Sequence, residues 1–243
     1  MTKPALTQDM HVYSTFSDGQ NTIEEIVAEA ERIGLTELVF ADHVRFDSKW
    51  VPDYVAAVSK YRKQTSVVLH CAVEAKILDS YGRLDLPRNL TGVEAVYVVG
   101  HQPPSPDGPM GPRSTRERIE AGDLDSRMVL GWLVAGTAAA LHCHEHVVIA
   151  HLFSALPTLG LSEGDVPGEM IDSLVEAASE SDARILVDER WRCPTVRTVR
   201  PFLQHGIPVL LGTGSKNRET IGRYDHCAGV VHEMTEPDLA RAG

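Results

Sequence analysis

The sequence predicts an α/β fold in which seven strands form a parallel sheet or barrel. Short apolar runs of strand length alternate along the chain with helical patterns, which is typical of βα units. A length of 243 residues suits one α/β barrel, and 43% hydrophobic residues are enough for a buried core. The pattern contains no linker, internal repeat or low-complexity segment, so we expect a single domain over residues 1–243.

The strand candidates are bounded by turn residues and separated by segments with helical periodicity. They are residues 10–14, 38–42, 67–74, 95–100, 147–151, 184–188 and 208–212. Between the first two, apolar residues recur on one helical face from Thr22 to a stop at Gly34. Residues 79–86 are predicted to form a turn or small hairpin, and the segment 102–113, rich in Pro and Gly, a long loop of the kind that often contacts substrate.

Composition excludes several classes of function. A formal net charge of −11 argues against a nucleic-acid-binding surface, which needs a basic patch. No run approaches the roughly 20 apolar residues of a membrane span, and the first residues do not resemble a signal peptide. We therefore expect a cytoplasmic protein with no membrane partner. The four cysteines are scattered, without a Cys-x-x-Cys pair, and are expected to be reduced thiols.

Potential metal ligands recur where the predicted strands end. They are His11 in the first strand, His43 after the second, Glu74 late in the third, His101 after the fourth and His151 at the end of the fifth. A lone histidine after a strand is usually structural. In a parallel barrel, however, the carboxyl ends of all strands gather on one face, so these five side chains should converge. Imidazole and carboxylate groups bind Zn²⁺, Mn²⁺ and Fe²⁺, and the pattern therefore predicts a metal site.

A second histidine-rich tract lies at residues 142–146, with the sequence His-Cys-His-Glu-His. It precedes the fifth strand rather than following it. We expect it near the opposite face of the barrel, in a structural or surface role.

The segment 9–19, Asp-Met-His-Val-Tyr-Ser-Thr-Phe-Ser-Asp-Gly, followed by Ala-Asp-His at 41–43, resembles the opening of the PHP (polymerase and histidinol phosphatase) superfamily. The usual form there is His-x-His followed by Ser-Asp-Gly. The resemblance extends from residue 9 to residue 224. It implies a distorted seven-stranded TIM-like (β/α)7 barrel, and three clustered metals held by nine ligands.

Six of the ligands that the resemblance implies are present: His11, Asp18, His43, Glu74, His101 and His151. Three are replaced, because Tyr13 stands for the second histidine of His-x-His, Gly214 for a late aspartate and Lys216 for the last histidine. The resemblance implies that Glu74, His101 and His151 complete one metal position and that the other two positions are eroded. We expect about one to two divalent ions (Zn, Mn or Fe) per chain.

The replacements leave alternatives open. A protonated lysine repels a nearby cation, so Lys216 either turns away or places its charge beside Asp18 and His43 where a metal would otherwise lie; we favour the second. Tyr13 could bind a metal, donate a proton or only fill space.

Loop residues beyond two strands could hold an anionic small molecule. Arg45 and Trp50 follow the second strand, and Arg190 and Arg192 follow the sixth. The planar fork of arginine suits phosphate, although each arginine alone is more often a solvated loop charge. The sequence has no Walker-type loop, no Gly-x-Ser-x-Gly elbow and no Gly-x-Gly-x-x-Gly.

We therefore expect a metal-dependent hydrolase of a small-molecule phosphate monoester. The residues with expected catalytic roles are His11, Tyr13, Asp18, His43 and Lys216. One alternative is a metal-dependent enzyme that hydrolyses, eliminates or cyclises a non-phosphate small molecule, and another is a non-catalytic PHP-like binding domain. An amidohydrolase barrel is the alternative fold, although Ser-Asp-Gly and Asp-His do not fit it. Oligomeric state is not predicted.

Overall fold

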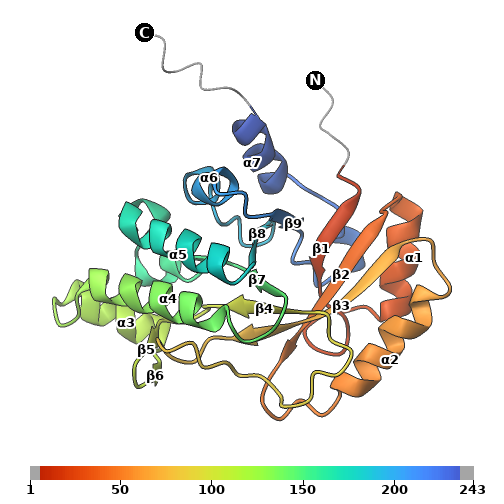
Figure 1. The fold of residues 1–243 in the computed structure, drawn as a ribbon, viewed down its shortest axis with the longest axis horizontal. Coiled ribbons are helices and arrows are strands. Elements are labelled where there is room, and N and C mark those ends of the chain that lie inside the picture. The colour runs from red at the N-terminus through yellow and green to blue at the C-terminus, as the bar shows by residue number, and fades with distance from the viewer. Residues whose placement is uncertain (1–5, 236–243) are drawn as a thin grey trace, which may run out of the picture.

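The computed structural model describes residues 6–235 and shows seven parallel strands curled into a nearly closed barrel (Figure 1). The strand order is β1-β2-β3-β4-β7-β8-β9. The strands are β1 Gln8–Val12, β2 Glu37–Val44, β3 Val68–Lys76, β4 Ala95–Val99, β7 Val147–Ile149, β8 Arg184–Asp188 and β9 Val209–Gly212. All seven predicted strands are confirmed, with small shifts at their ends.

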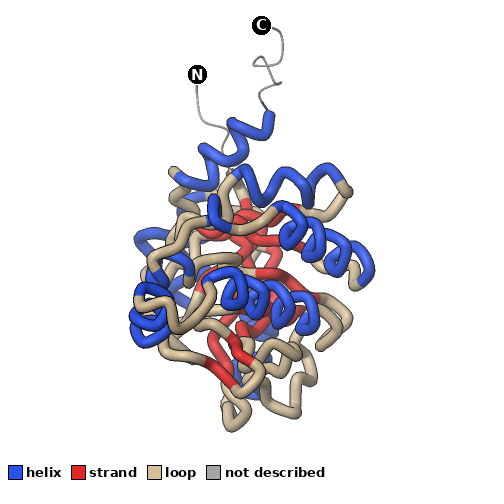
Figure 2. The backbone as a smooth tube through the Cα atoms, turned by 90° about the vertical axis from the view of Figure 1, so that its left-hand side faces the viewer, coloured by secondary structure: helices blue, strands red, loops and turns tan. Residues whose placement is uncertain are grey.

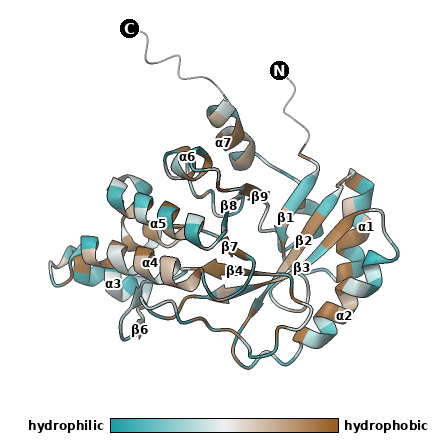
Figure 3. Ribbon diagram, in the orientation of Figure 1, coloured by the Kyte–Doolittle hydropathy of each residue, from teal (hydrophilic) through white to brown (hydrophobic). Residues whose placement is uncertain are grey.

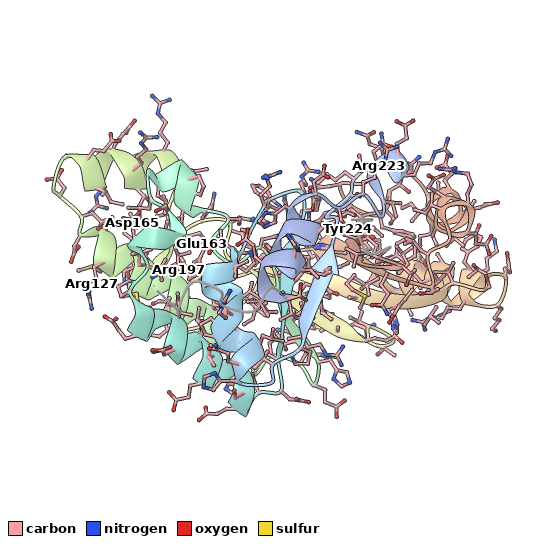
Figure 4. The ribbon with its side chains drawn as sticks, turned by 90° about the horizontal axis from the view of Figure 1, so that it is seen from above. Arg127, Glu163, Asp165, Arg197, Arg223 and Tyr224 are labelled. Atoms are coloured by element: carbon pink, nitrogen blue, oxygen red, sulfur yellow. The ribbon has the colours of Figure 1, made fainter. Side chains whose placement is uncertain are left out.

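Contacts between the segment after β9 and β1 close the barrel. The Tyr13 amide donates to the Ser215 carbonyl at 2.9 Å, and the Gly214 amide donates to the His11 carbonyl at 2.9 Å. Tyr224, labelled in Figure 4, lies beside the start of β1 and donates its hydroxyl to the Gln8 carbonyl at 2.6 Å. The last strand is therefore held against the first at the level of the predicted site.

Helices surround the strands (Figure 2). They are α1 Ile23–Ile33, α2 Val51–Arg62, α3 Pro112–Glu120, α4 Ser126–Ala140, α5 Gly168–Glu180, α6 Val196–Gln204 and α7 His226–Thr235, with short 3-10 turns η1 Leu156–Leu159, η2 Glu163–Asp165 and η3 Arg218–Thr220. The predicted first helix is confirmed: Thr22 caps α1 in a capping box, and Gly34 ends it with φ of 79°. Within residues 6–235, no helix combines the length and the apolar character that crossing a membrane would require.

The strands separate two apolar layers. In Figure 3, β4 and β7 are largely brown, whereas the helices carry both brown and teal residues. Because side chains alternate along a strand, one set packs outward under the helices and the other points into the barrel. The inward cluster consists of Val39, Ala41, Ala72, Tyr97, Val99, Val148, Ala150 and Leu186. Polar residues that continue this alternation reach the carboxyl end of the barrel, where the predicted site lies.

The connections agree only partly with the prediction. The turn at 79–86 is confirmed, since Ile77 and Leu84 pair in an antiparallel bridge around it. The predicted loop at 102–113 instead contains an antiparallel hairpin of β5 Pro104–Ser105 and β6 Gly108–Pro109, and α3 begins at its end. Pro104 of this hairpin packs so closely on α4 that a Cβ at Gly136 would lie 3.1 Å from its ring. The prediction of four free cysteines is confirmed.

Candidate metal centre

Glu74 lies at the middle of the site, near the end of β3, with its side chain fully buried. Its Oε1 lies 2.6 Å from Nε2 of His43 and 3.2 Å from Nε2 of His101. Its Oε2 lies 3.1 Å from Nε2 of His11 and 3.1 Å from Nε2 of His151. Four histidines from β1, β2 and the segments after β4 and β7 therefore surround one carboxylate.

The ligand atoms fall into two groups that share Glu74. His11, Glu74 and His151 form a buried triad, and His43, Glu74 and His101 form a triad that is partly open to solvent; within each, the atoms lie within 4.8 Å of one another. The family resemblance grouped His101 with His151 instead. The structure separates these two histidines because they face different oxygens of Glu74.

The buried triad fits a divalent cation. Within the described residues, Nε2 of His11, which faces Glu74, is buried without a hydrogen-bond partner. Such an atom costs about 1–3 kcal/mol when nothing satisfies it. Imidazole nitrogens beside a carboxylate are the donor set that Zn²⁺ and similar ions accept.

Glu74 and His151 shift each other's pKa, because both are buried and lie in contact. Burial alone would raise the pKa of Glu74, but the adjacent His151 and its neighbours hold that pKa well below the usual value. Burial alone would lower the pKa of His151, but the Glu74 and Asp188 carboxylates raise this pKa to about 10. The surrounding histidines therefore favour the ionised form of Glu74.

Tyr13 occupies the place of the second histidine and is 2% exposed. Its hydroxyl donates to Oε2 of Glu74 at 2.7 Å and lies 3.1 Å from Nε2 of His151. Burial and the Glu74 charge raise the pKa of Tyr13 well above its usual value. The side chain is thus a neutral phenol that contacts the cluster, and burial opposes the ionised form that a metal ligand would need.

Lys216 points into the site rather than away from it. Its Nζ donates to Oδ2 of Asp18 at 2.6 Å and lies 5.4 Å from the centre of the Tyr13 ring. Nδ1 of His43 lies 3.0 Å from the same Asp18 oxygen. The hydrogen bond from Lys216 lowers the pKa of Asp18. The lysine charge therefore stands beside Asp18 and His43.

The loop that carries Asp18 is held by Asp42, the residue before His43. Asp42 accepts from the Ser14 amide at 3.0 Å and from the Ser17 hydroxyl at 2.6 Å. Burial raises the pKa of Asp42 to about 6. The turn needs Gly19, because a Cβ there would overlap the Tyr13 carbonyl. Asp42 faces away from the metal triads and fixes the loop.

A cavity of 550 Å³ opens beside the exposed triad. Asp18, His43, Glu74 and His101 line its inner side, and Arg45, Trp50 and Lys76 lie on its outer walls. Trp50 packs against Phe16, with ring centres 5.7 Å apart. Arg45 and Trp50, predicted as substrate contacts, therefore lie in the same cavity as the candidate ligands.

The other predicted contacts are placed differently. Arg190 lines a separate pocket of 310 Å³ together with Gly214 and Lys216. Arg192 lines neither pocket. Residues 144–146 of the histidine-rich tract line a cavity of 440 Å³ with Glu37 and His70, at the amino ends of the strands, which is the end expected from the sequence.

Two further residues, Asp188 and Trp191, lie at the site although the sequence did not single them out. Asp188, the last residue of β8, is buried with Oδ2 3.3 Å from Nδ1 of His151 and 3.7 Å from Nδ1 of His11. Trp191 is 43% exposed, and its ring centre lies 5.6 Å from that of His101. Because side chains alternate along a strand, Asp188 points into the barrel on the same side as Leu186. Asp188 ends a predicted strand, as His151 does, and this position could have indicated it as a site residue.

The sequence matches the PHP domain family over residues 9–156. This is more than half of the chain, and the protein belongs to the PHP domain family. No curated protein sequence matches it.

Two solved structures share the fold. One is a candidate histidinol phosphatase, hisK, from Listeria monocytogenes, with TM-score 0.62, 14% identity, and coverage of 89% of this chain and 97% of that chain. The other is histidinol phosphate phosphatase (HISK) from Lactococcus lactis subsp. lactis Il1403, complexed with zinc, L-histidinol and phosphate, with TM-score 0.65, 13% identity, and coverage of 95% and 94%. At these identities the likeness shows the PHP-type barrel, as the sequence predicted.

Proposed function

We propose that this protein is a metal-dependent phosphoesterase that hydrolyses a small-molecule phosphate monoester. The observation that carries the proposal is the arrangement at Glu74, each of whose oxygens contacts two histidines. Membership of the PHP domain family and a fold shared with a phosphatase complexed with zinc support the same class of chemistry.

His11, Glu74 and His151 would hold one divalent ion, and His43 and His101 would hold a second with the other oxygen of Glu74. Zn, Mn and Fe all suit this donor set, at about one to two ions per chain. When bound, such an ion supplies Lewis acidity toward phosphate and lowers the pKa of a water molecule. Asp18, the sixth expected ligand, pairs with Lys216 and His43 through its Oδ2 and lies outside both triads.

The substrate would bind in the 550 Å³ cavity. Arg45 and Lys76 place positive charge on its walls and suit a phosphate group, while Trp50 and Phe16 offer an aromatic surface to the organic part. Lys216 adds positive charge beside Asp18, and His43 is held between Asp18 and Glu74 at the inner end of the cavity. His43 could therefore give a proton to the leaving oxygen only when it does not hold the second ion.

Elemental analysis combined with a phosphatase assay tests this proposal. The purified protein should contain about one to two ions per chain and release phosphate from at least one member of a panel of sugar, nucleotide and amino-alcohol phosphates. Glu74→Gln should lose most of the metal and the activity together, because it removes the charge shared by both triads. The matched control is Glu37→Gln at the opposite end of the barrel, which should keep both. A wild-type protein without metal would contradict the proposal.

A second candidate is a metal-dependent enzyme that acts on a non-phosphate small molecule by hydrolysis, elimination or cyclisation. The specific observation in its favour is that a neutral phenol and an ammonium, Tyr13 and Lys216, stand in the site where the family resemblance implies metal ligands. The same experiment separates the two candidates. Metal bound at full occupancy with every phosphate ester inert would favour the second.

A further inference from the structure

We propose that Asp188 is a positioning residue of the metal centre, and that it orients both His11 and His151 by accepting the Nδ1–H of each ring. The inference rests on the proposed function, since it takes the buried triad to hold a metal ion on its Glu74 side. It adds to the site a residue that neither the sequence motifs nor the two metal-ligand triads include.

The two histidine rings lie between two carboxylates. They stack with centres 5.0 Å apart and planes inclined at 26°, so that corresponding edges face the same way. On one edge, both Nε2 atoms lie 3.1 Å from Oε2 of Glu74. On the other edge, the Nδ1 atoms lie 3.3 Å (His151) and 3.7 Å (His11) from Oδ2 of Asp188. A neutral imidazole binds metal through one nitrogen and carries its proton on the other, and the group that accepts that proton determines which nitrogen faces the metal.

The histidine nitrogens that face Asp188, and the Asp188 oxygen that faces them, form no hydrogen bonds with other described residues. Nδ1 of both histidines and Oδ2 of Asp188 are buried near one another and have no hydrogen-bond partner within the described residues, so a small movement of the rings would let Asp188 accept from them. The other Asp188 oxygen, Oδ1, accepts from the Trp191 amide at 2.7 Å. One oxygen therefore holds the loop after β8 in place, and the other is left for the two rings.

Gly214 gives an independent reason to assign this role to Asp188. Its φ is +58°, and a Cβ on this residue would lie 2.6 Å from Oδ2 of Asp188. The Asp188 carboxylate thus uses the space into which a side chain at position 214 would project. A carboxylate at position 214, which the family resemblance leads one to expect, could not coexist with Asp188 in its present place. In this protein the carboxylate next to β1 therefore comes from Asp188 at the end of β8, and not from position 214.

Zinc affinity and histidine tautomers test the proposal together. Zinc dissociation constants would be measured by competition with a chelator, and the ring nitrogens of zinc-loaded protein would be observed by ¹⁵N NMR. In the wild type, both His11 and His151 should bind zinc through Nε2 and carry a proton on Nδ1. Asp188→Asn keeps the shape of the side chain but removes its charge, and should weaken zinc binding about 10- to 100-fold. Asp79→Asn is the matched control, because Asp79 is also a buried aspartate but accepts from the Tyr81 and Arg83 amides and from the Arg83 side chain in the turn after β3, and its zinc affinity should match the wild type.

A second variant covers the case in which Asp188→Asn does not fold. Gly214→Ala keeps the carboxylate but pushes a methyl group against it, and should also weaken zinc binding. The proposal is overturned if folded Asp188→Asn binds zinc as tightly as the wild type, or if zinc in the wild type lies on Nδ1, which would make Asp188 a ligand. Wild-type protein that binds no zinc would instead contradict the proposed function.

Discussion

Lys216 brings a positive charge to the edge of the site. Its ammonium lies 2.6 Å from Asp18 and over the Tyr13 ring, next to the partly exposed triad. A cation in that triad would be repelled by this charge, whereas an anionic substrate would be attracted by it. Of the two triads, we therefore expect the buried one to hold an ion more readily than the partly exposed one.

Replacing Lys216 by methionine should raise the pKa of Asp18 toward its usual value. The lysine lowers that pKa, so the pair stabilises the native protein above the ordinary pKa of an aspartate and loses this contribution as the pH falls through the lowered pKa. The titration of the Asp18 carboxyl carbon, followed by ¹³C NMR in chelator-treated protein, should move to higher pH in Lys216→Met. The control is Lys63→Met at the exposed end of α2, and an unchanged Asp18 titration in Lys216→Met would contradict the assigned contact.

At the scale of the element, the site residues lie at the carboxyl ends of the strands. Helix α1 begins shortly after the loop that carries Asp18. The Thr22 hydroxyl caps α1 by accepting from the Glu25 amide at 3.3 Å. In return, the Glu25 carboxylate accepts from the Thr22 amide at 2.9 Å. The buried face of α1 then packs on the barrel through Ile23, Ile26 and Val27. The helix thus anchors the Ser-Asp-Gly loop without contacting the metal triads.

Thr22→Ala should destabilise the protein by about 1 kcal/mol, because it leaves amides of the first helical turn without a cap. Urea unfolding followed by circular dichroism measures this change. Zinc affinity should be unchanged, since the cap serves the helix and not the ligands. Ser173→Ala, in the exposed middle of α5, should have a smaller effect, and equal losses in the two variants would show that the cap contributes nothing of its own.

The sequence predicted the elements well because their signals are local. Short apolar runs of strand length indicated all seven strands, and Thr22 and Gly34 marked both ends of α1. The β5–β6 hairpin escaped prediction because it depends on packing against α4, far along the chain.

The site was less predictable, because its details depend on distances across the barrel. Strand ends indicated the histidines and Glu74, but which Glu74 oxygen faces His101 or His151 depends on how the strands twist relative to one another. Asp188 was missed although it ends a predicted strand, since its partners come from β1 and from the segment after β7.

At the scale of the whole molecule, closure of β9 on β1 brings residues from both ends of the chain to one site. Asp9 accepts from the Thr213 amide at 2.9 Å and from its hydroxyl at 2.6 Å, which joins the first strand to the segment that carries Gly214 and Lys216. Because the site needs both ends of the chain, we propose that residues 1–243 fold as a single domain. The metal centre is then a property of the closed barrel and not of any local motif.

Anomalous diffraction from zinc-soaked crystals would show directly whether the buried triad binds a metal ion. We predict a zinc peak within coordination distance of His11, Glu74 and His151, at about 2.0–2.2 Å from the nitrogen and oxygen atoms. Occupancy at this position should exceed any occupancy between His43 and His101, because Lys216 opposes a cation there. A well-ordered barrel with no zinc peak beside Glu74 would show that these residues do not form a metal site.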